Sequence, residues 1–535
     1  MHRADFATGN FNVVLASVIA VLLLGLGSLR CEAAGLSLID FNSVSAFGSA
    51  GAGRGVNGGD ASVISTNPAG MALLHQEQAV VSGSGVFPGG TARGQYQTPA
   101  SNPPNPEHLY TPEQVDYYQF HGGNGDYHRC TGFDAGKGIC YAQSSKVDDF
   151  LHPAIVPSLY YARPIDDDIW IGLAVYAPYG GESRYPIESV FRYQALSSKM
   201  QLLVAQPTLS WRYREDLALG VGVQIARGKL EMGRTLNPWA TALNDAFADI
   251  QGNGLGLGAT FGVIWEPADA LTLGLSYRSP VKITFKGDLT GTGVPGLGIV
   301  MAHYSDENDE YFGGPIPAAR ESARWLMMYR PPTVKEDIRS EVTFPESVDL
   351  SAAWKLNSEW TLLGSAIWTR WSRFKHFKIS SHGSLPGRSA SDIVSTSNGV
   401  PSGHLLAYLP QNWSDTWSLS CGAQYQLSDN LVLRAGYSHD NSPVSDATRS
   451  ARIPDNDRQW LTMGVGYKLS DNYTLDLAYG YMFMPSFSIQ EANYKADGSR
   501  QGLTPDGTFE DPGHLTARYT RMHAHTLSAQ LTVRF

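Results

Sequence analysis

The chain ends in Leu527-Ser528-Ala529-Gln530-Leu531-Thr532-Val533-Arg534-Phe535, a stretch in which apolar and polar residues alternate. An alternation of period two places the apolar side chains on one face of a β-strand and the polar side chains on the other. The same pattern recurs at 417–427, 461–469 and 473–481. This repetition predicts an all-β chain whose long strands each separate an apolar from a polar environment.

Short and long connections alternate between the predicted strands. The short ones are polar turns at 165–168, 214–216, 267–270, 357–359, 428–430 and 470–472. The long ones are polar segments at 88–152, 181–200, 234–253, 290–341, 381–415, 443–458 and 489–520. Six short turns join twelve strands, and a strand at about 78–87 together with the C-terminal strand brings the predicted total to fourteen.

An even number of strands, with tight turns at one end and long loops at the other, is typical of an outer-membrane barrel. In hydrocarbon every backbone N–H and C=O needs a partner within the protein, so a spanning sheet has to close on itself. We therefore expect a 14-stranded antiparallel transmembrane β-barrel with apolar side chains toward lipid and polar ones toward the lumen. A soluble sandwich also alternates, but it explains neither the loop asymmetry nor the aromatic residues near strand ends, such as Trp211, Trp265 and Trp354.

The composition agrees with a barrel and excludes other classes. Charged residues make up only 17% of the 535 residues, against about 25% in ordinary soluble domains. No stretch after residue 30 reaches the roughly 18 apolar residues that a membrane helix needs. The net charge of −10 provides no basic surface for phosphates, so no nucleic-acid partner is expected.

Residues 1–33 are predicted to be a secretory signal peptide. Positive charge at Arg3 precedes an apolar core at 11–26, and Cys31-Glu32-Ala33 has small residues at the −3 and −1 positions of a cleavage site. An uncleaved N-terminal anchor is the alternative. A lipoprotein signal at Cys31 is disfavoured because Arg30, rather than a small residue, precedes it.

The signal peptide and the barrel together predict the location. We expect the mature chain to lie in the outer membrane of a Gram-negative bacterium, with outer-membrane lipid and lipopolysaccharide as its surroundings. The aromatic C-terminal residue, Phe535, closes the last strand and is the expected contact with the barrel-assembly machinery.

The segment 34–76 does not alternate and is rich in small and polar residues. The lumen of a fourteen-stranded barrel is too wide for wall side chains alone to fill. We expect 34–76 to form a small N-terminal hatch that plugs a barrel made of 77–535. The principal extracellular loops of this barrel are then 88–152, 290–341 and 381–415.

The cysteines and histidines point to no metal centre. Cys130 and Cys140 are separated by nine residues of a polar, Gly-rich segment, which predicts a disulfide-closed loop in an oxidising compartment. Cys421 lies within an apolar alternation and is expected to act as a small hydrophobic side chain. His523 and His525 share one face of a strand but have no evident third ligand. No metal and no cofactor are expected.

Several short motifs occur together along the chain. They are Ala34-Gly35-Leu36, the segment 60–71 with Asn67-Pro68-Ala69, 277–287, 371–374, Asp440-Asn441-Ser442-Pro443-Val444, Ile453-Pro454-Asp455, Asp457-Arg458 and Trp460. In this combination the chain resembles the FadL family of outer-membrane transporters, which move long-chain fatty acids or other hydrophobic compounds and include the TodX-like aromatic hydrocarbon channels. The block that begins at Asp440 is the most specific.

The resemblance implies passive, gradient-driven uptake. A hydrophobic ligand would be captured among the extracellular loops, pass a gate formed by the hatch with Asn67, Pro68 and Ala69, and leave sideways through a kink in the third strand. Pro178-Tyr179-Gly180 stands at the place of that kink. Pro178 cannot donate a ladder hydrogen bond and Gly180 tolerates unusual torsions. An ordinary strand end beside a loop is the alternative interpretation.

The resemblance also suggests where a ligand binds. Leu36, Leu38 and Phe41 of the hatch are candidate apolar contacts, unless they only pack the plug. A basic residue that pairs with a carboxylate is implied near 229–234, but Met232 stands at its place and Arg234 lies two residues further on. Neutral hydrocarbons therefore stay open as substrates.

Asp440 matches a functional acidic position of the family, and a solvated loop face is the alternative reading of this residue. Enzyme chemistry has little support: the glycines at 51, 53 and 55 lack the third glycine of a dinucleotide fingerprint, since Val56 follows. Two functions remain, a hydrophobic-compound transporter and, alternatively, an outer-membrane adhesin or structural barrel whose Cys130–Cys140 loop contacts other cells.

Overall fold

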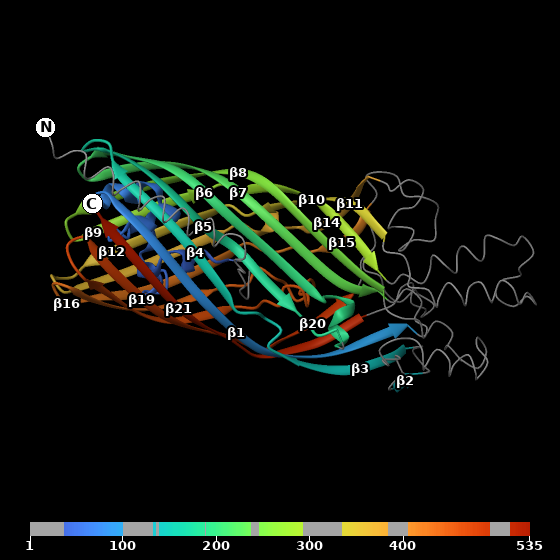
Figure 1. The fold of residues 1–535 in the computed structure, drawn as a ribbon. Coiled ribbons are helices and arrows are strands. Elements are labelled where there is room, and N and C mark those ends of the chain that lie inside the picture. Colours follow the sequence, from blue (N-terminus) through green and yellow to red (C-terminus); the bar gives the residue numbers. More distant parts are fainter. Residues whose placement is uncertain are drawn as a thin grey trace, which may run out of the picture.

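The computed structural model describes residues 37–99, 132–134, 139–187, 189–236, 246–292, 334–383, 405–492 and 514–535. The predicted signal peptide, Leu36 and Cys130 lie outside these residues, as does the side chain of Cys140. The described strands form one closed antiparallel barrel with the short turns at one end, the turn end, and the long connections at the other, the loop end (Figure 1).

Within the described residues, no helix combines the length and the apolar character that crossing a membrane requires.

Fourteen strands make the wall, as the alternation predicts, and the barrel closes where β1 pairs with β21. In wall order they are β1 (Gln78–Pro99), β3 (Ile139–Asp148) with β4 (Ala154–Pro164), β5 (Ile169–Arg184), β6 (Ser197–Arg214), β7 (Leu217–Leu236), β8 (Ala246–Ala268), β9 (Leu271–Arg278) with β10 (Val281–Thr292), β11 (Val334–Phe344) with β12 (Ser347–Lys355), β13 (Trp360–Thr369) with β14 (His376–Gly383), β15 (Leu405–Pro410) with β16 (Thr416–Ser428), β17 (Leu431–Asp440), β18 (Arg458–Lys468), β19 (Tyr473–Met484) with β20 (Phe487–Ala492), and β21 (His514–Arg534). A further short strand, β2 (Gly132–Asp134), pairs with β3 at the loop end.

Strands end and restart within two residues of all six predicted short turns. The strands nevertheless continue further toward the loop end than the alternation predicts. Residues 88–99 and 139–148 of the expected loop 88–152 belong to strands, as do parts of 290–341 and 381–415. The reason at β1 is a bulge: its register against β21 shifts between Gly89 and Thr91, opposite Arg521, which has a φ of +56°. A bulge interrupts the alternation without ending the strand.

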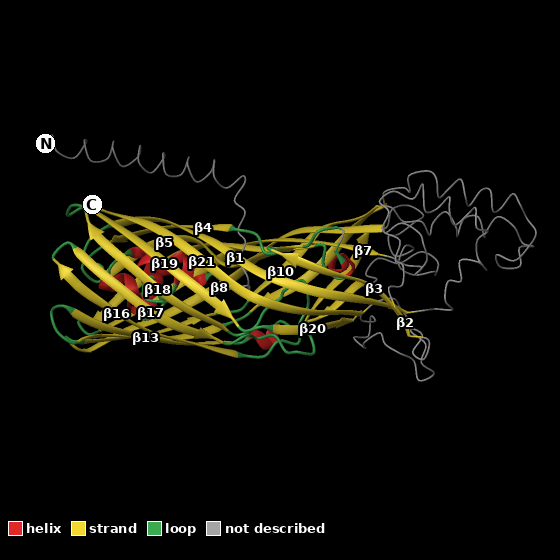
Figure 2. Cartoon of the chain, turned by 90° about the horizontal axis from the view of Figure 1, so that it is seen from below, coloured by secondary structure: helices red, strands yellow, loops and turns green. Residues whose placement is uncertain are grey.

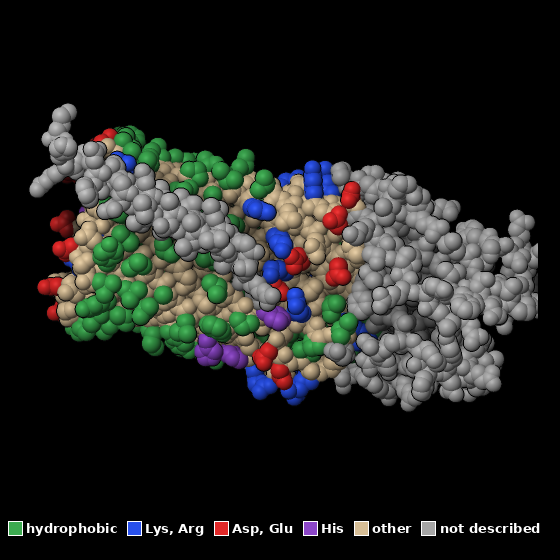
Figure 3. Space-filling model, viewed as in Figure 1, with side chains coloured by type: hydrophobic (Ala, Val, Ile, Leu, Met, Phe, Trp, Pro, Cys, Tyr) green, Lys and Arg blue, Asp and Glu red, His purple; other side chains and the backbone are tan. Residues whose placement is uncertain are grey.

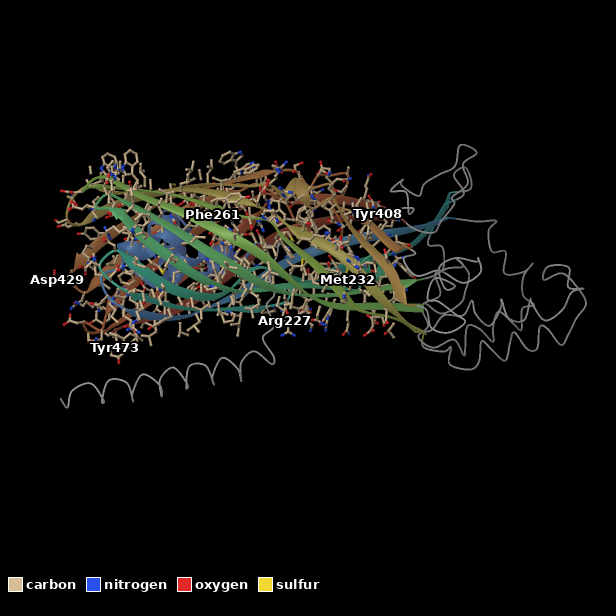
Figure 4. The ribbon with its side chains drawn as sticks, turned by 90° about the horizontal axis from the view of Figure 1, so that it is seen from above. Arg227, Met232, Phe261, Tyr408, Asp429 and Tyr473 are labelled. Atoms are coloured by element: carbon tan, nitrogen blue, oxygen red, sulfur yellow. The ribbon has the colours of Figure 1, made fainter. Side chains whose placement is uncertain are left out.

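The polarity of the wall inverts along the strands, and β7 illustrates this. Near the turn end its outward side chains are apolar, from Leu219 to Ile225, and Gln224 points inward. Beyond that point Arg227 and Lys229 face outward while Leu230 and Met232 are buried inside (Figure 4). Figure 3 shows the same change, since hydrophobic side chains give way toward the loop end to a zone of mixed Lys, Arg, Asp and Glu side chains. The expectation of a polar lumen therefore holds only for the half near the turn end.

The N-terminal segment (37–74) lies inside the barrel near the turn end as a chain of short helices (Figure 2). They are η1 (Ile39–Asn42), α2 (Val44–Phe47), η2 (Arg54–Val56), η3 (Ala61–Ser65) and η4 (Pro68–Leu73). Wall strands bond this segment on several sides: Val44 N–H donates to Gln530 Oε1 at 3.1 Å, Gly53 N–H to Ser365 Oγ at 3.0 Å, and Thr462 Oγ1 to the Gly48 carbonyl at 3.2 Å. The inward polar side chains of this half thus have partners in the segment that fills it.

Candidate functional site

The wall is interrupted along the seam between β4 and β5. The two strands pair only over residues 159–164 of β4, and near the loop end an isolated bridge joins Leu151 to Ser183 while Arg184 N–H donates to the Phe150 carbonyl at 2.9 Å. Within the unpaired stretch, β5 also shifts register against β6 between Tyr176 and Tyr179. Pro178 contributes to the shift because it has no N–H to donate. The predicted kink at Pro178-Tyr179-Gly180 is therefore a place where β5 leaves its neighbour β4.

Residues of the N-terminal segment occupy this seam. Ser37 forms an antiparallel bridge with Tyr179, and Leu38 N–H donates to the Pro178 carbonyl at 2.8 Å. The Asn42 carboxamide donates to the Ala177 carbonyl at 2.9 Å and accepts from the Ala177 N–H at 3.2 Å. Residues 37–42 thus supply β5 with the hydrogen bonds that β4 does not make there.

Asn42 also bonds the other side of the seam. Its main-chain carbonyl accepts from Ser158 Oγ and from the Tyr160 hydroxyl, both on β4 and both at 2.8 Å. Asn42 is fully buried, so its departure would take a hydrogen bond away from each of these buried groups. One side chain and one carbonyl therefore join β4 to β5.

A cavity lies inside the barrel next to this seam, toward the loop end. About 580 Å³ of empty space, part of it open to solvent, is enclosed by β5, β6, β7, β14 and the segment 452–454. Its apolar lining is Leu151, Met200, Leu230, Met232, Phe377 and Ile453. Met232, found where the family resemblance implies a basic residue, is thus an apolar wall residue of the cavity.

The charged groups of the lining differ in how they are compensated. Lys199 Nζ lies 2.7 Å from Glu182 Oε2, so these two side chains form an ion pair at the cavity wall. Arg452 is buried, and its Nη1 donates to the Ser197 carbonyl at 3.2 Å and to Ser198 Oγ at 3.1 Å. Its Nε has no hydrogen-bond partner among the described residues. Arg452 is therefore a buried cation with an unused donor, at a cavity that Met200, Leu230 and Met232 help to line.

The surroundings of Arg452 disfavour its positive charge. Burial, with the nearby Arg234 as the second cause, lowers the pKa of Arg452 to about 10, and Glu491 opposes this shift. A cation that has lost hydration and lies near a second cation gains from an anionic partner. Arg234, the basic residue singled out from the sequence, thus acts on the cavity through its charge, although it is not among the residues that line it.

A loop that folds into the barrel brings Arg452 to the cavity. Residues 441–457 connect β17 to β18, which lie across the barrel from β5 and β6. Ser183 Oγ donates to the Arg452 carbonyl and the Tyr185 hydroxyl to the Ala451 carbonyl, each at 2.9 Å. These bonds attach the loop to β5 and the residue after it, at the far end of the unpaired stretch.

Asp440 holds the base of the same loop. Its carboxylate pairs with Arg458 at 2.5 Å, and Arg458 lies 3.7 Å from Asp455. The Ser442 hydroxyl in turn donates to Asp455 at 2.8 Å. Asp440 is not among the residues that line the cavity, and its contacts are with the loop that carries Arg452.

The Asn67-Pro68-Ala69 element contacts the wall very closely. Asn67 caps η4 by accepting from Ala69 N–H at 3.0 Å and donates to the Val263 carbonyl of β8 at 3.1 Å. A Cβ on Gly262 would lie 2.0 Å from Asn67 Oδ1, and a Cβ on Gly220 would lie 2.3 Å from Ala69 N. The close contact therefore needs glycine at these two wall positions.

The remaining predicted residues have structural contacts. Leu38 and Phe41 are buried in the N-terminal segment, and Phe41 packs edge-on against Phe47 and Trp460. Tyr179 is stacked on Phe344, with ring centroids 5.2 Å apart. The sequence analysis missed Asn42 and Arg452. Neither residue has a chemical signature of its own in the sequence: Asn42 follows Phe41, and Arg452 directly precedes the Ile453-Pro454-Asp455 motif.

Comparisons with known proteins place this geometry in context. Residues 25–535 match the model of the family described as outer membrane protein transport protein (OMPP1/FadL/TodX). A long-chain fatty acid transport protein of Escherichia coli K12 is 25% identical over 351 residues, which are 60% of this chain and 68% of the relative. The match therefore spans about two thirds of that relative.

Solved structures share the fold. A Pseudomonas aeruginosa FadL homologue superposes with a TM-score of 0.69 at 22% identity, covering 94% of this chain and all of the other. The Pseudomonas putida toluene transporter TodX gives a TM-score of 0.55 at 14% identity, with 95% of this chain and 100% of the other covered. With the family match over almost its whole length and a closed fourteen-stranded barrel, the chain belongs to the OMPP1/FadL/TodX family of outer-membrane transport proteins.

Proposed function

We propose that the protein takes up amphipathic hydrophobic compounds with an anionic headgroup, of the long-chain carboxylate class, across the outer membrane. The ligand enters from the loop end, occupies the cavity beside Met200 and Met232, and leaves sideways through the seam between β4 and β5. Residues 34–76 act as the hatch, and 37–42 block the seam until they move. The concentration gradient of the ligand drives the passage.

The observation that carries the carboxylate class is the buried guanidinium of Arg452 at a cavity whose other charged lining residues, Lys199 and Glu182, pair with each other. Relatives in the family are named as transporters of long-chain fatty acids and of toluene. These compounds differ in that only the fatty acid has a charged headgroup, so the question is whether the ligand of this protein has one. Met232 alone favours a neutral hydrocarbon. Arg452 supplies from the loop the cation that Met232 does not provide on the cavity face of β7, and Lys199 is already paired with Glu182.

The apolar lining accounts for most of the binding energy in this proposal. Burying a methylene group contributes about 0.8 kcal/mol, so a chain that places about six methylenes in the cavity gains about 5 kcal/mol. A charge-assisted hydrogen bond from Arg452 adds about 1.5–3 kcal/mol. The headgroup then sets selectivity, while the chain sets most of the affinity.

The test compares a long-chain fatty acid with the alcohol of the same chain length in the purified protein. Arg452→Gln is expected to weaken binding of the acid about tenfold or more and to change binding of the alcohol little, because only the acid uses the cation. Lys229→Gln, which alters a cation on the outer face of β7, serves as the matched control and is expected to change neither ligand. Equal loss for acid and alcohol in Arg452→Gln, or no loss for either, would contradict the proposed headgroup class.

The gating steps need a separate measurement. A disulfide between Ser37→Cys and Tyr179→Cys, which form a backbone bridge, should hold the seam closed. We expect uptake to stop under oxidising conditions and to return after reduction, while ligand binding in the cavity persists. Unchanged uptake in the cross-linked protein would argue against lateral release between β4 and β5.

A further inference from the structure

The outer face of the barrel carries a row of three cations at the loop end. Arg518 on β21 pairs in register with Arg93 on β1, and Arg93 pairs in register with Lys146 on β3. All three side chains are exposed on the outer face. The residues next to them in the strands, Ala92, Val147 and Ala517, are buried and point inward. Adjacent strands are about 4.8 Å apart, so three positive groups are held within a short distance on a rigid sheet.

Their charge is only partly compensated within the protein. Lys146 pairs with Asp148, and Arg521 Nη2 lies 3.5 Å from the same carboxylate. Among the described residues, Arg93 and Arg518 have neither an ion pair nor a hydrogen-bonded side-chain partner. Four cations therefore share one paired carboxylate, and like charges directly opposite each other in a sheet are destabilising. The arrangement calls for an anionic partner from outside the chain.

The position of the row limits what that partner is. Outward residues of β21 are apolar from Val533 and Leu531 to Leu527, and an aromatic and histidine cluster with Tyr481, His525 and His523 follows. Aromatic belts of this kind mark the membrane–water interface. The cations begin directly beyond this aromatic and histidine cluster. Along the lower edge of the molecule in Figure 3, histidine side chains and then Lys and Arg side chains follow the hydrophobic surface. Groups at this level face the headgroups of the outer leaflet rather than the lumen.

We propose that Arg518, Arg93 and Lys146 bind the phosphate groups of the outer-leaflet glycolipid, lipopolysaccharide. Guanidinium groups bind phosphate oxygens through two parallel hydrogen bonds, and lysine adds a point charge. The site lies on the outer face, separate from the cavity, and the lipid acts as an annular ligand that fixes the barrel in the leaflet. The proposal is independent of the transported compound.

Native mass spectrometry of the detergent-solubilised full chain tests it, with deep-rough lipopolysaccharide and the same lipid after removal of its phosphates as the two probes. The wild type is expected to retain the phosphorylated lipid about tenfold more tightly or better, since each cation near an anionic membrane surface adds to the attraction. The triple substitution Arg93→Gln/Lys146→Gln/Arg518→Gln should abolish this preference. Equal retention of both lipids by the wild type, or an unchanged preference in the variant, overturns the proposal.

A matched control removes three exposed cations at the turn end, Arg163→Gln/Arg214→Gln/Lys355→Gln, and is expected to keep the preference. Loss of the preference in this control would mean that overall charge, rather than the row, decides. Should the first variant fail to fold, the wild type still provides a test. Raising the salt from about 0.05 M to about 0.5 M shortens the screening length and must then reduce the preference, and a preference that salt leaves unchanged overturns the proposal.

Discussion

The carboxamide of Asn42 hydrogen-bonds both backbone groups of Ala177, donating to its carbonyl at 2.9 Å and accepting from its N–H at 3.2 Å. Elsewhere in the wall such backbone groups bond a neighbouring strand, whereas here they bond a side chain. Ala177 lies in the stretch of β5 that β4 leaves unpaired. The closure of the seam thus depends on a residue of the N-terminal segment, 135 positions away in the sequence.

Replacing this carboxamide by an apolar group of similar size, Asn42→Leu, should loosen the seam. Losing the bonds to two buried backbone groups costs about 1–3 kcal/mol for each group left unsatisfied. We expect hydrogen exchange at the Ala177 amide to become about tenfold faster or more. Exchange measured by mass spectrometry on peptides that cover 174–180 would detect the change.

Asn57→Leu provides the control, because Asn57 bonds Ser45 within the N-terminal segment at 2.8 Å and does not touch β5. Its exchange at Ala177 should match that of the wild type. If both variants accelerate exchange equally, general loosening of the segment, rather than the Asn42 contacts, explains the effect.

Much of the fold is predictable because the membrane imposes a simple rule on the sequence. Each stretch that crosses lipid has to alternate, and each connection at the turn end is short and polar, as at 165–168 and 470–472. The rule fails where the wall extends beyond the lipid. There Arg227 faces outward and Leu230 inward, so the polarity inverts, and the bulge opposite Arg521 breaks the alternation.

The site is less predictable because its members come together only in three dimensions. Pro178 could be identified from its chemistry, since proline interrupts a ladder wherever it occurs. Asn42 and Arg452 have no such local signature: each owes its role to a partner on a distant strand. Arg234 was found through the resemblance to the family, but it affects the cavity through its charge on Arg452 instead of lining it.

Adding a single methyl group to the wall should displace the N-terminal segment. In Gly262→Ala the new Cβ would lie 2.0 Å from Asn67 Oδ1, so the Asn67 cap of η4 has to move. Overpacking of this kind costs about 1–3 kcal/mol. We expect faster protease cleavage within 37–74 in the folded barrel. The control is Gly83→Ala, whose Cβ would have no neighbour within 4 Å, and equal cleavage of both variants would contradict the steric argument.

Ion pairs of the buried Arg54 with Asp40 and Asp349 should hold the N-terminal segment to β12. Arg54 is buried and lies 2.6 Å from Asp40 and 2.5 Å from Asp349. Arg54→Met leaves the buried carboxylate of Asp349 without its cation, a loss of about 3–5 kcal/mol. Urea unfolding in lipid vesicles would measure it. The double variant Arg54→Met/Asp349→Asn removes the unpaired charge and should recover part of the loss, whereas identical stabilities of the single and double variants would show that the charge does not matter.

The extent of the lipid belt can be tested on the outer face of β8. Its outward apolar residues run from Leu255 to Trp265, which spans about 25 Å along the membrane normal at the usual strand rise and tilt. Phe261, 51% exposed on this face, lies in the interior of that span.

Phe261→Arg should therefore destabilise the barrel by about 2–4 kcal/mol, the usual loss for an arginine near the bilayer midplane. Gln251→Arg, on the same face beyond Leu255, should change the unfolding free energy by less than about 0.5 kcal/mol, because its side chain is outside the lipid. Phe261→Leu controls for the loss of the ring itself. Unfolding in vesicles would measure all three variants. If Gln251→Arg destabilised the barrel as much as Phe261→Arg, lipid would extend over the region where Arg227 and Lys229 now mark its edge. The cationic row on β21, β1 and β3 would then lie beside acyl chains and not beside the headgroups, which would contradict the proposed phosphate site.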